Sequence, residues 1–245
     1  MDLEILSEDR DWIAVRKMPG LLSEDGGEGK PSLPRLLREY LHTERGERDP
    51  YVGVLHRLDR DVGGVMLFAR NKKAAADLSA QIVGGTVRKE YLAVVCGTPP
   101  ERGELSDLLY HDPRRAKTFV VNRMRRGVRE ASLSYRVLAR TGEGSEARSL
   151  IHVLLHTGRT HQIRVQFSSR RWPVAGDGRY GGGSGRIALF SAAMTFVHPV
   201  RGDSVRITAL PEWEGEWARF SPEAAAAALE DGYYEPGKSQ KEEPK

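Results

Sequence analysis

The sequence of 245 residues contains a single cysteine, Cys96. One cysteine excludes an internal disulfide and any structural zinc site built from several cysteines. No apolar run approaches the roughly 18 residues that a membrane-spanning helix needs. The acidic start Met1-Asp2-Leu3-Glu4 also lacks the basic flank of a signal peptide. These absences predict a soluble cytoplasmic protein that has no membrane partner.

Acidic residues are outnumbered by basic residues outside the last part of the chain. The net charge is +4, yet residues 212–245 hold nine acids against four bases, so the positive charge lies in residues 1–211. A basic body suggests a polyanionic partner such as nucleic acid. Pyrophosphate-bearing small molecules remain an alternative, because net charge carries no specificity.

Hydrophobic periodicity and turn residues predict more strands than helices. Strands are expected at 3–6, 12–17, 65–69, 87–95, 132–139, 149–156, 187–197 and 204–209, with a basic hairpin at 111–129 and helices at 33–41, 72–82, 160–167 and 222–229. The strands come in hairpins more than in regular strand-helix alternation, which favours an α+β fold with a mixed or antiparallel sheet. One domain is expected over residues 1–235, followed by a disordered polar tail at 236–245.

The stretch Leu55 to Gly64 has an unusual arrangement of charge. Asp59 lies between Arg57 and Arg60, and a glycine pair follows before the apolar run 65–69. An acid beside cations stays ionised and can act as nucleophile, base or electrostatic anchor. The ordinary alternative is a solvated, salt-bridged turn.

A second polar cluster lies at the start of the helix expected at 160–167. It comprises His156, Thr157, Arg159, Thr160, His161, Gln162, Arg164 and Gln166. Backbone donors at a helix N-terminus and arginine side chains both suit phosphate or a nucleobase edge. Arg164 is expected at the edge of the core, where it needs a carboxylate, and Asp59 is the acid we consider for it. An exposed helix with ordinary polar decoration is the alternative.

Other motifs are weak. Residues 176–181 match the GxGxxG spacing, but no helix follows, so we reject a dinucleotide site. No serine has the strand-elbow-helix setting of a serine hydrolase. His156 and His161 are five residues apart, which is not the spacing of a helical zinc site, and no metal is expected.

The segment 111–129 is strongly basic. It contains one acid, Asp112, and seven bases: Arg114, Arg115, Lys117, Arg123, Arg125, Arg126 and Arg129. A hairpin with a basic face that contacts phosphates explains the pattern, and a solvated, highly charged loop is the alternative.

Several stretches, in the same order along the chain, resemble the RluA family of pseudouridine synthases. They are His56-Arg57-Leu58-Asp59 with Gly64 and a strand ending Ala69-Arg70, then Lys89-Glu90-Tyr91-Leu92 through Gly97, Thr157-Gly158-Arg159-Thr160-His161-Gln162-Ile163-Arg164-Val165, Pro173 to Asp177, Tyr180-Gly181 and Phe196-Val197-His198-Pro199. The resemblance covers roughly residues 10–210.

This resemblance implies a mixed, mainly antiparallel sheet with a central active-site cleft, and the conversion of uridine to pseudouridine in ribosomal or transfer RNA. It implies no metal, no organic cofactor and a monomer. Asp59 would be the essential aspartate, Tyr91 would stack on the uracil and accept or relay a proton, and Arg164 would pair with Asp59. Arg57 would enter the RNA stack to displace the target nucleotide. The expected RNA-binding residues are His56, Arg57, Arg60, Arg159, Thr160, His161 and Gln162.

The sequence departs from the family pattern at three places. Val62-Gly63-Gly64 replaces Thr-Ser-Gly, with the loss of two hydroxyls that could hold the loop. Leu189-Phe190-Ser191-Ala192 stands where a Leu-His-Ala pattern is common, so a histidine contact is expected to be missing. From the resemblance we also expect the chain to begin at the catalytic domain, without an S4-type RNA-binding module. The altered loop after Asp59 leaves open an inactive RNA-binding protein or RNA chaperone on the same fold. A third alternative is a nucleoside-cleaving hydrolase that releases free uracil.

Overall fold

The computed structural model describes residues 3–27 and 30–233. Within these residues, one 11-stranded sheet is flanked by four α-helices, so the α+β class is confirmed. The tail expected at 236–245 lies outside the described residues. Among the described helices, none has the length and apolar character needed to cross a membrane.

The strands and helices alternate irregularly along the chain. The strands are β1 (Glu4–Glu8), β2 (Trp12–Lys17), β3 (Gly53–Val54), β4 (Gly63–Ala69), β5 (Arg88–Cys96), β6 (Arg102–Asp112), β7 (Lys117–Val121), β8 (Val128–Thr141), β9 (Arg148–Leu155), β10 (Leu189–Val197) and β11 (Ser204–Thr208). The helices are α1 (Leu33–Thr43), α2 (Lys72–Val83), α3 (Gln162–Ser169) and α4 (Pro222–Glu230).

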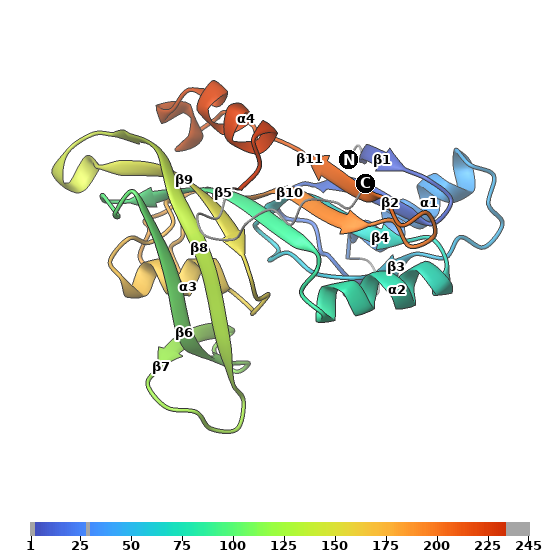
Figure 1. The fold of residues 1–245 in the computed structure, drawn as a ribbon, viewed down its shortest axis with the longest axis horizontal. Helices are drawn as coiled ribbons and strands as arrows, with labels where there is room; N and C mark the ends of the chain where they lie inside the picture. Colours follow the sequence, from blue (N-terminus) through green and yellow to red (C-terminus); the bar gives the residue numbers. More distant parts are fainter. Residues whose placement is uncertain (1–2, 28–29, 234–245) are drawn as a thin grey trace, which may run out of the picture.

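The sheet is mixed and mainly antiparallel, as the sequence predicts. Its order is β1-β2-β4-β10-β5-β9-β8-β6-β7, with β3 paired to β4 and β11 paired to β10. The parallel pair, β4 with β10, joins the N-terminal strands β1 to β4 to the rest of the sheet. At the far end, β6, β7 and the start of β8 extend away from the rest of the molecule (Figure 1).

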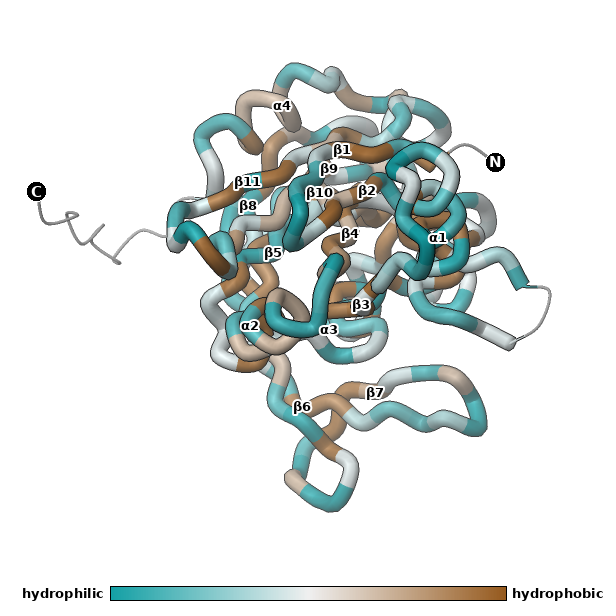
Figure 2. Tube along the Cα trace, turned by 90° about the vertical axis from the view of Figure 1, so that its right-hand side faces the viewer, coloured by the Kyte–Doolittle hydropathy of each residue, from teal (hydrophilic) through white to brown (hydrophobic). Residues whose placement is uncertain are grey.

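Both faces of the sheet are covered by apolar side chains. On one face, Leu37 of α1 and Phe167 of α3 belong to a buried cluster that also contains Tyr91. On the other face, Leu78 of α2 and Leu229 of α4 pack with Phe190 and Phe196. Hydrophobic residues accordingly concentrate on the central strands (Figure 2). The stabilising force of this core is apolar burial on both sides of one sheet.

Most predicted elements are present, and the differences have local causes. The helix expected from Thr160 begins at Gln162, because His161 has a left-handed φ of 54° that no helical residue adopts. Strand β6 was not predicted, since only Leu105 and Leu109 of its eleven residues are buried and its apolar residues show no period-two alternation. The two-residue strand β3 was missed because it is too short to show a pattern. Asn71 caps α2 as expected and accepts a hydrogen bond from the Ala74 N–H at 2.9 Å.

Gly64 is required where β4 meets β10. Its φ is 125°, and a Cβ there would lie 2.3 Å from the Ser191 carbonyl oxygen. We therefore expect Gly64→Ala to lower the free energy of unfolding by about 3 kcal/mol or more, because strain and a backbone clash add. Gly63→Ala is the matched control. Its Cβ would meet its nearest neighbour at 3.2 Å without a positive φ, so a loss of about 1 kcal/mol is expected. Equal urea midpoints for the two variants would contradict this account.

Candidate active site

Asp59 lies in the loop between β3 and β4, at the centre of the sheet. The preceding residue, Leu58, is buried in the same cluster as Tyr91. The Ser23 hydroxyl donates to the Leu58 carbonyl at 2.7 Å and accepts from the Leu58 N–H at 3.0 Å. These contacts fix the backbone on one side of Asp59.

Lys17 fixes the other side of the loop. Its ammonium, fully buried, donates to the Arg60 carbonyl at 2.7 Å and to the Val62 carbonyl at 2.8 Å. Burial lowers the pKa of Lys17 to about 8, and the charges of Asp61 and Asp59 oppose that fall. The loop therefore has an anchor in place of the two hydroxyls that Val62-Gly63 lacks. Sequence reasoning missed Lys17, because nothing in the segment 12–17 distinguishes it from an edge lysine.

We expect Lys17→Met to destabilise the protein by about 2 kcal/mol, since two loop carbonyls lose charge-assisted hydrogen bonds. Activity should fall about tenfold or more as the Asp59 loop loosens. Urea unfolding and a rate assay measure the two effects. Lys73→Met, at an exposed position of α2, should leave both unchanged. A Lys17→Met variant with wild-type stability and rate would show that the loop needs no anchor.

Arg164 connects two carboxylates. It projects from α3, is 5% exposed, and its Nη1 donates to Asp59 Oδ2 at 2.8 Å. Its Nε and Nη2 donate to the two oxygens of Asp177, at 2.6 and 2.9 Å. Burial alone lowers the pKa of Arg164, but hydrogen bonds to Asp177 and Asp59 raise it above its usual value. The guanidinium therefore stays charged and fixed in orientation.

The contact between Arg164 and Asp59 is the one considered from the sequence, whereas Asp177 was not predicted as a partner. A second partner for Arg164 could have been expected from the sequence, because one carboxylate cannot satisfy all five N–H donors of a buried guanidinium. Asp177 follows Gly176, whose φ of 77° is part of the turn that presents the carboxylate.

Tyr91 reaches the same region from β5, opposite Ser191 of β10. It is 7% exposed and belongs to the apolar cluster that contains Leu58 and Ile163, the neighbours of Asp59 and Arg164. Burial raises the pKa of Tyr91 above its usual value, a hydrogen bond with Ser191 opposes that rise, and the Asp59 charge adds to it. Tyr91 is thus a neutral phenol within electrostatic reach of Asp59.

Three predicted RNA-binding residues are exposed cations near this site. Arg57 is 60% exposed and pairs with Glu24 at 2.7 Å. The Arg60 Nε donates to the Gly20 carbonyl at 3.2 Å, and the Arg159 Nε donates to the Glu130 carbonyl at 2.9 Å. These partners are at the surface, so all three side chains are accessible from solvent.

Three other predicted RNA-binding residues have internal contacts. His56 Nε2 accepts from the Leu67 N–H at 3.0 Å, and burial lowers the pKa of His56 to about 3, so its ring is neutral. The Gln162 carboxamide is buried and bonds to Thr157 and to the Ser132 carbonyl. The Thr160 carbonyl accepts from the Thr118 hydroxyl at 2.8 Å. We therefore assign these contacts to loop structure, and RNA contact by these residues stays a prediction.

The remaining predicted residue, His161, lies beside Asp59. Its Nε2 is 3.7 Å from Asp59 Oδ2, and its Nδ1 is 2.9 Å from the Tyr180 hydroxyl oxygen. The Tyr180 ring in turn covers the Arg164 guanidinium, with 5.1 Å between Cζ and the ring centroid. Sequence reasoning assigned no role to Tyr180.

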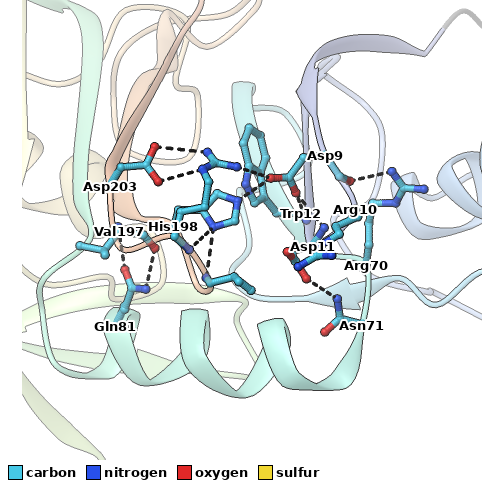
Figure 3. A network of polar contacts seen from close by, with 12 residues as sticks. Asp9, Arg10, Asp11, Trp12, Arg70, Asn71, Gln81, Val197, His198 and Asp203 are labelled. Carbon is cyan, nitrogen blue, oxygen red and sulfur yellow. Dashed lines mark hydrogen bonds and ion pairs between the residues drawn. The ribbon is translucent and has the colours of Figure 1, made fainter.

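Among the described residues, one group of three could offer ligands to a metal: Asp9, Asp11 and His198. Figure 3 shows that these side chains already bond to protein groups. His198 Nδ1 accepts from the N–H groups of Val200 and Arg201, so His198 Nε2 carries the proton that bonds Asp9 Oδ2. This network joins the β1–β2 and β10–β11 turns, which accounts for the cluster without an ion.

A cavity of about 500 Å³ adjoins the Asp59 loop. Met18, Pro19, Gly63, Gly176 and Phe190 are among its lining residues. Asp59, Tyr91 and Arg164 do not line it, so the cavity lies beside the catalytic candidates and not over them.

A family model described as RNA pseudouridylate synthase matches residues 11–169. The chain is 34% identical over 229 residues to ribosomal large subunit pseudouridine synthase D of Xylella fastidiosa, an alignment that covers 86% of this chain and 66% of that protein. It is 31% identical over 208 residues to the uncharacterized RNA pseudouridine synthase YhcT of Bacillus subtilis, an alignment that covers 83% of this chain and 67% of that protein.

The solved structure of human RNA pseudouridylate synthase domain containing 4 has a TM-score of 0.72 at 20% identity, covering 91% of this chain and 93% of that one, which supports the fold. The alignments with the two bacterial relatives cover 66% and 67% of those proteins, so the chain spans about two thirds of their length. The family match and these relatives confirm the resemblance noted in the sequence, and the chain belongs to the RNA pseudouridylate synthase family, RluA type.

Proposed function

We propose that this protein isomerises uridine to pseudouridine in RNA, with Asp59 as the essential catalytic residue. The observation that carries the proposal is the 2.8 Å contact between Asp59 and a buried Arg164, formed beside Tyr91 at the centre of a pseudouridine synthase fold. Neither a salt-bridged turn nor an exposed polar helix would hold these three groups together.

The chemistry follows from the groups present. Breaking the bond between C1′ and N1 of uridine builds positive character on the ribose, which the Asp59 carboxylate stabilises or traps as a covalent bond to C1′. The bonding pair leaves with the uracil, which stays bound and turns. A new bond then forms between C5 and C1′, and the bond from Asp59 to C1′, where one had formed, breaks with its electron pair returning to the carboxylate. C5 loses its proton and N1 gains one, so the product is an isomer of the substrate.

Arg164 and Tyr91 have different roles in this scheme. Arg164 holds Asp59 at a fixed orientation, and its bonds to Asp177 keep the guanidinium from turning away. Because Tyr91 stays protonated, it suits stacking on the uracil and donating or relaying a proton better than accepting one at neutral pH.

RNA would bind across exposed cations. Arg57 and Arg60 flank the catalytic loop, and Arg57 is placed to enter the RNA stack when the target nucleotide is displaced. The arginines in the two loops that flank β7 are exposed on the segment that extends from the sheet in Figure 1. Their contacts with phosphates would make RNA affinity strongly dependent on salt.

The names of the relatives favour ribosomal RNA of the large subunit as the first substrate to test, with transfer RNA as the second. We also propose that the protein works in the cytoplasm, as a monomer, without metal or organic cofactor.

Pseudouridine mapping across total RNA, from cells with and without this protein, tests the function directly. Loss of specific pseudouridines is expected. An unchanged map, together with no tritium release from C5-labelled RNA in vitro, would favour an inactive RNA-binding protein on the same fold. Release of free uracil would indicate a hydrolase.

A further inference from the structure

His161 lies between the catalytic candidates and a buried tyrosine. Its imidazole is 13% exposed, with Nε2 facing Asp59 Oδ2 at 3.7 Å and Nδ1 facing the Tyr180 hydroxyl at 2.9 Å. The left-handed backbone at His161 ends the preceding loop and directs the ring to this position, one turn before Arg164. Neither contact is needed to form α3, because no side-chain cap bond is made by His161.

The hydrogen bonds of Tyr180 determine the tautomer of His161. The Thr118 N–H donates to the Tyr180 hydroxyl oxygen at 2.8 Å. The single hydroxyl proton can then go to His161 Nδ1 at 2.9 Å or to the Thr118 carbonyl at 3.3 Å, and the shorter contact is favoured. An Nδ1 that accepts this proton leaves the imidazole proton on Nε2, which faces Asp59.

We propose that His161 is a positioning residue for Asp59: the Tyr180 hydroxyl holds it in the neutral Nε2–H tautomer, and this N–H and Arg164 together aim the carboxylate. The inference rests on the proposed function. Both groups approach the same oxygen, Oδ2, so Oδ1 is the oxygen free to act on C1′ of the ribose. The 3.7 Å separation exceeds a hydrogen bond, and contacts of this kind tighten when substrate fills a catalytic site.

The charges around His161 keep it neutral. Burial lowers the pKa of His161, and the nearby Asp59 charge opposes this, while Arg164, Arg179 and His111 add to the lowering. Lys117 lies over the Tyr180 ring at 5.2 Å and adds further positive charge. Protonation would place a hydrogen on Nδ1, and Tyr180 would have to stop donating there. Acid should therefore disrupt the arrangement below the ordinary pKa of histidine.

Two variants test the proposal. His161→Asn suits the left-handed backbone, which asparagine tolerates, and removes the imidazole. Tyr180→Phe keeps the ring over Arg164 and removes only the hydroxyl. We expect kcat to fall about 10- to 100-fold in His161→Asn and about tenfold in Tyr180→Phe, with KM within about threefold of wild type.

The pH profile separates positioning from simple structural damage. Loss of the Tyr180 proton donor removes a bond that favours neutral His161, so the acid limb of kcat should move to higher pH in Tyr180→Phe. In His161→Asn the contribution of this histidine to the acid limb should disappear. The matched controls are Tyr40→Phe and His42→Asn on α1, where Tyr40 bonds Glu8 and His42 bonds the Glu47 carbonyl. Both controls should leave kcat and the acid limb of its pH profile unchanged.

Nuclear magnetic resonance of the imidazole nitrogens provides a readout that does not depend on activity. We expect wild-type His161 as the neutral Nε2–H tautomer at pH 7 and a mixed or altered tautomer in Tyr180→Phe. An Nδ1–H tautomer in the wild type, or wild-type kcat and acid limb in His161→Asn, would overturn the proposal. An inactive wild type with the expected tautomer would instead count against the proposed function.

Discussion

Asp59→Asn should lower the rate of pseudouridine formation at least about a thousandfold while the protein stays folded. Asparagine has the shape of aspartate, and its carbonyl can still accept the hydrogen bond from Arg164 Nη1. The substitution removes only the charge, and the charge is what stabilises or traps the developing cation at C1′. Tritium release from C5-labelled uridine in RNA measures the rate, and urea unfolding verifies the fold.

Asp61→Asn is the matched control for this experiment. Asp61 is two residues further along the same loop and is exposed, so the loss of its charge should leave the rate within about twofold of wild type. Equal activity of Asp59→Asn and wild type would end the assignment of Asp59. A large loss in both variants would show that the loop as a whole, and not one carboxylate, supports the reaction.

The sequence predicts the periodic parts of this protein well. Strands such as β5 and helices such as α2 have a continuous apolar pattern or clear caps, and these signals are local. The order β4-β10-β5 could not be predicted, because β10 is added from about one hundred residues further along the chain. Nothing in the sequences of β4 and β5 specifies that β10 lies between them.

The candidate site shows the same division. Asp59 could be selected because arginines and a glycine pair surround it, and Arg164 because basic residues and a glycine lie at a helix start. Lys17 and Tyr180 could not, since each acts through partners distant in sequence: Lys17 through the carbonyls of residues 60 and 62, and Tyr180 through Thr118 and His161. Contacts with backbone carbonyls and the choice of a histidine tautomer leave no pattern in a sequence, so the roles of Lys17 and Tyr180 are found only from coordinates.

Arg164→Met should be damaging in two separable ways. The variant leaves the Asp177 carboxylate, whose side chain is 1% exposed, without the guanidinium that binds both its oxygens. Removal of one partner of a buried ion pair costs about 3–5 kcal/mol, so we expect a loss of stability of that size. Activity should fall at least about a hundredfold, because Asp59 also loses its orienting contact.

The double variant Arg164→Met with Asp177→Asn separates the two effects. Removing the second buried charge should restore much of the lost stability, since no uncompensated carboxylate remains, but activity should stay low because Asp59 is still unpaired. Arg170→Met is the matched control. This arginine, the C-cap residue of α3, also pairs with an acid, Asp107, yet it is 28% exposed, so a loss of about 1 kcal/mol or less is expected. Urea midpoints measure the stability of the three variants, and tritium release measures their activity, so the two losses can be compared separately. A double variant no more stable than Arg164→Met would show that the Asp177 charge is not what the buried arginine compensates.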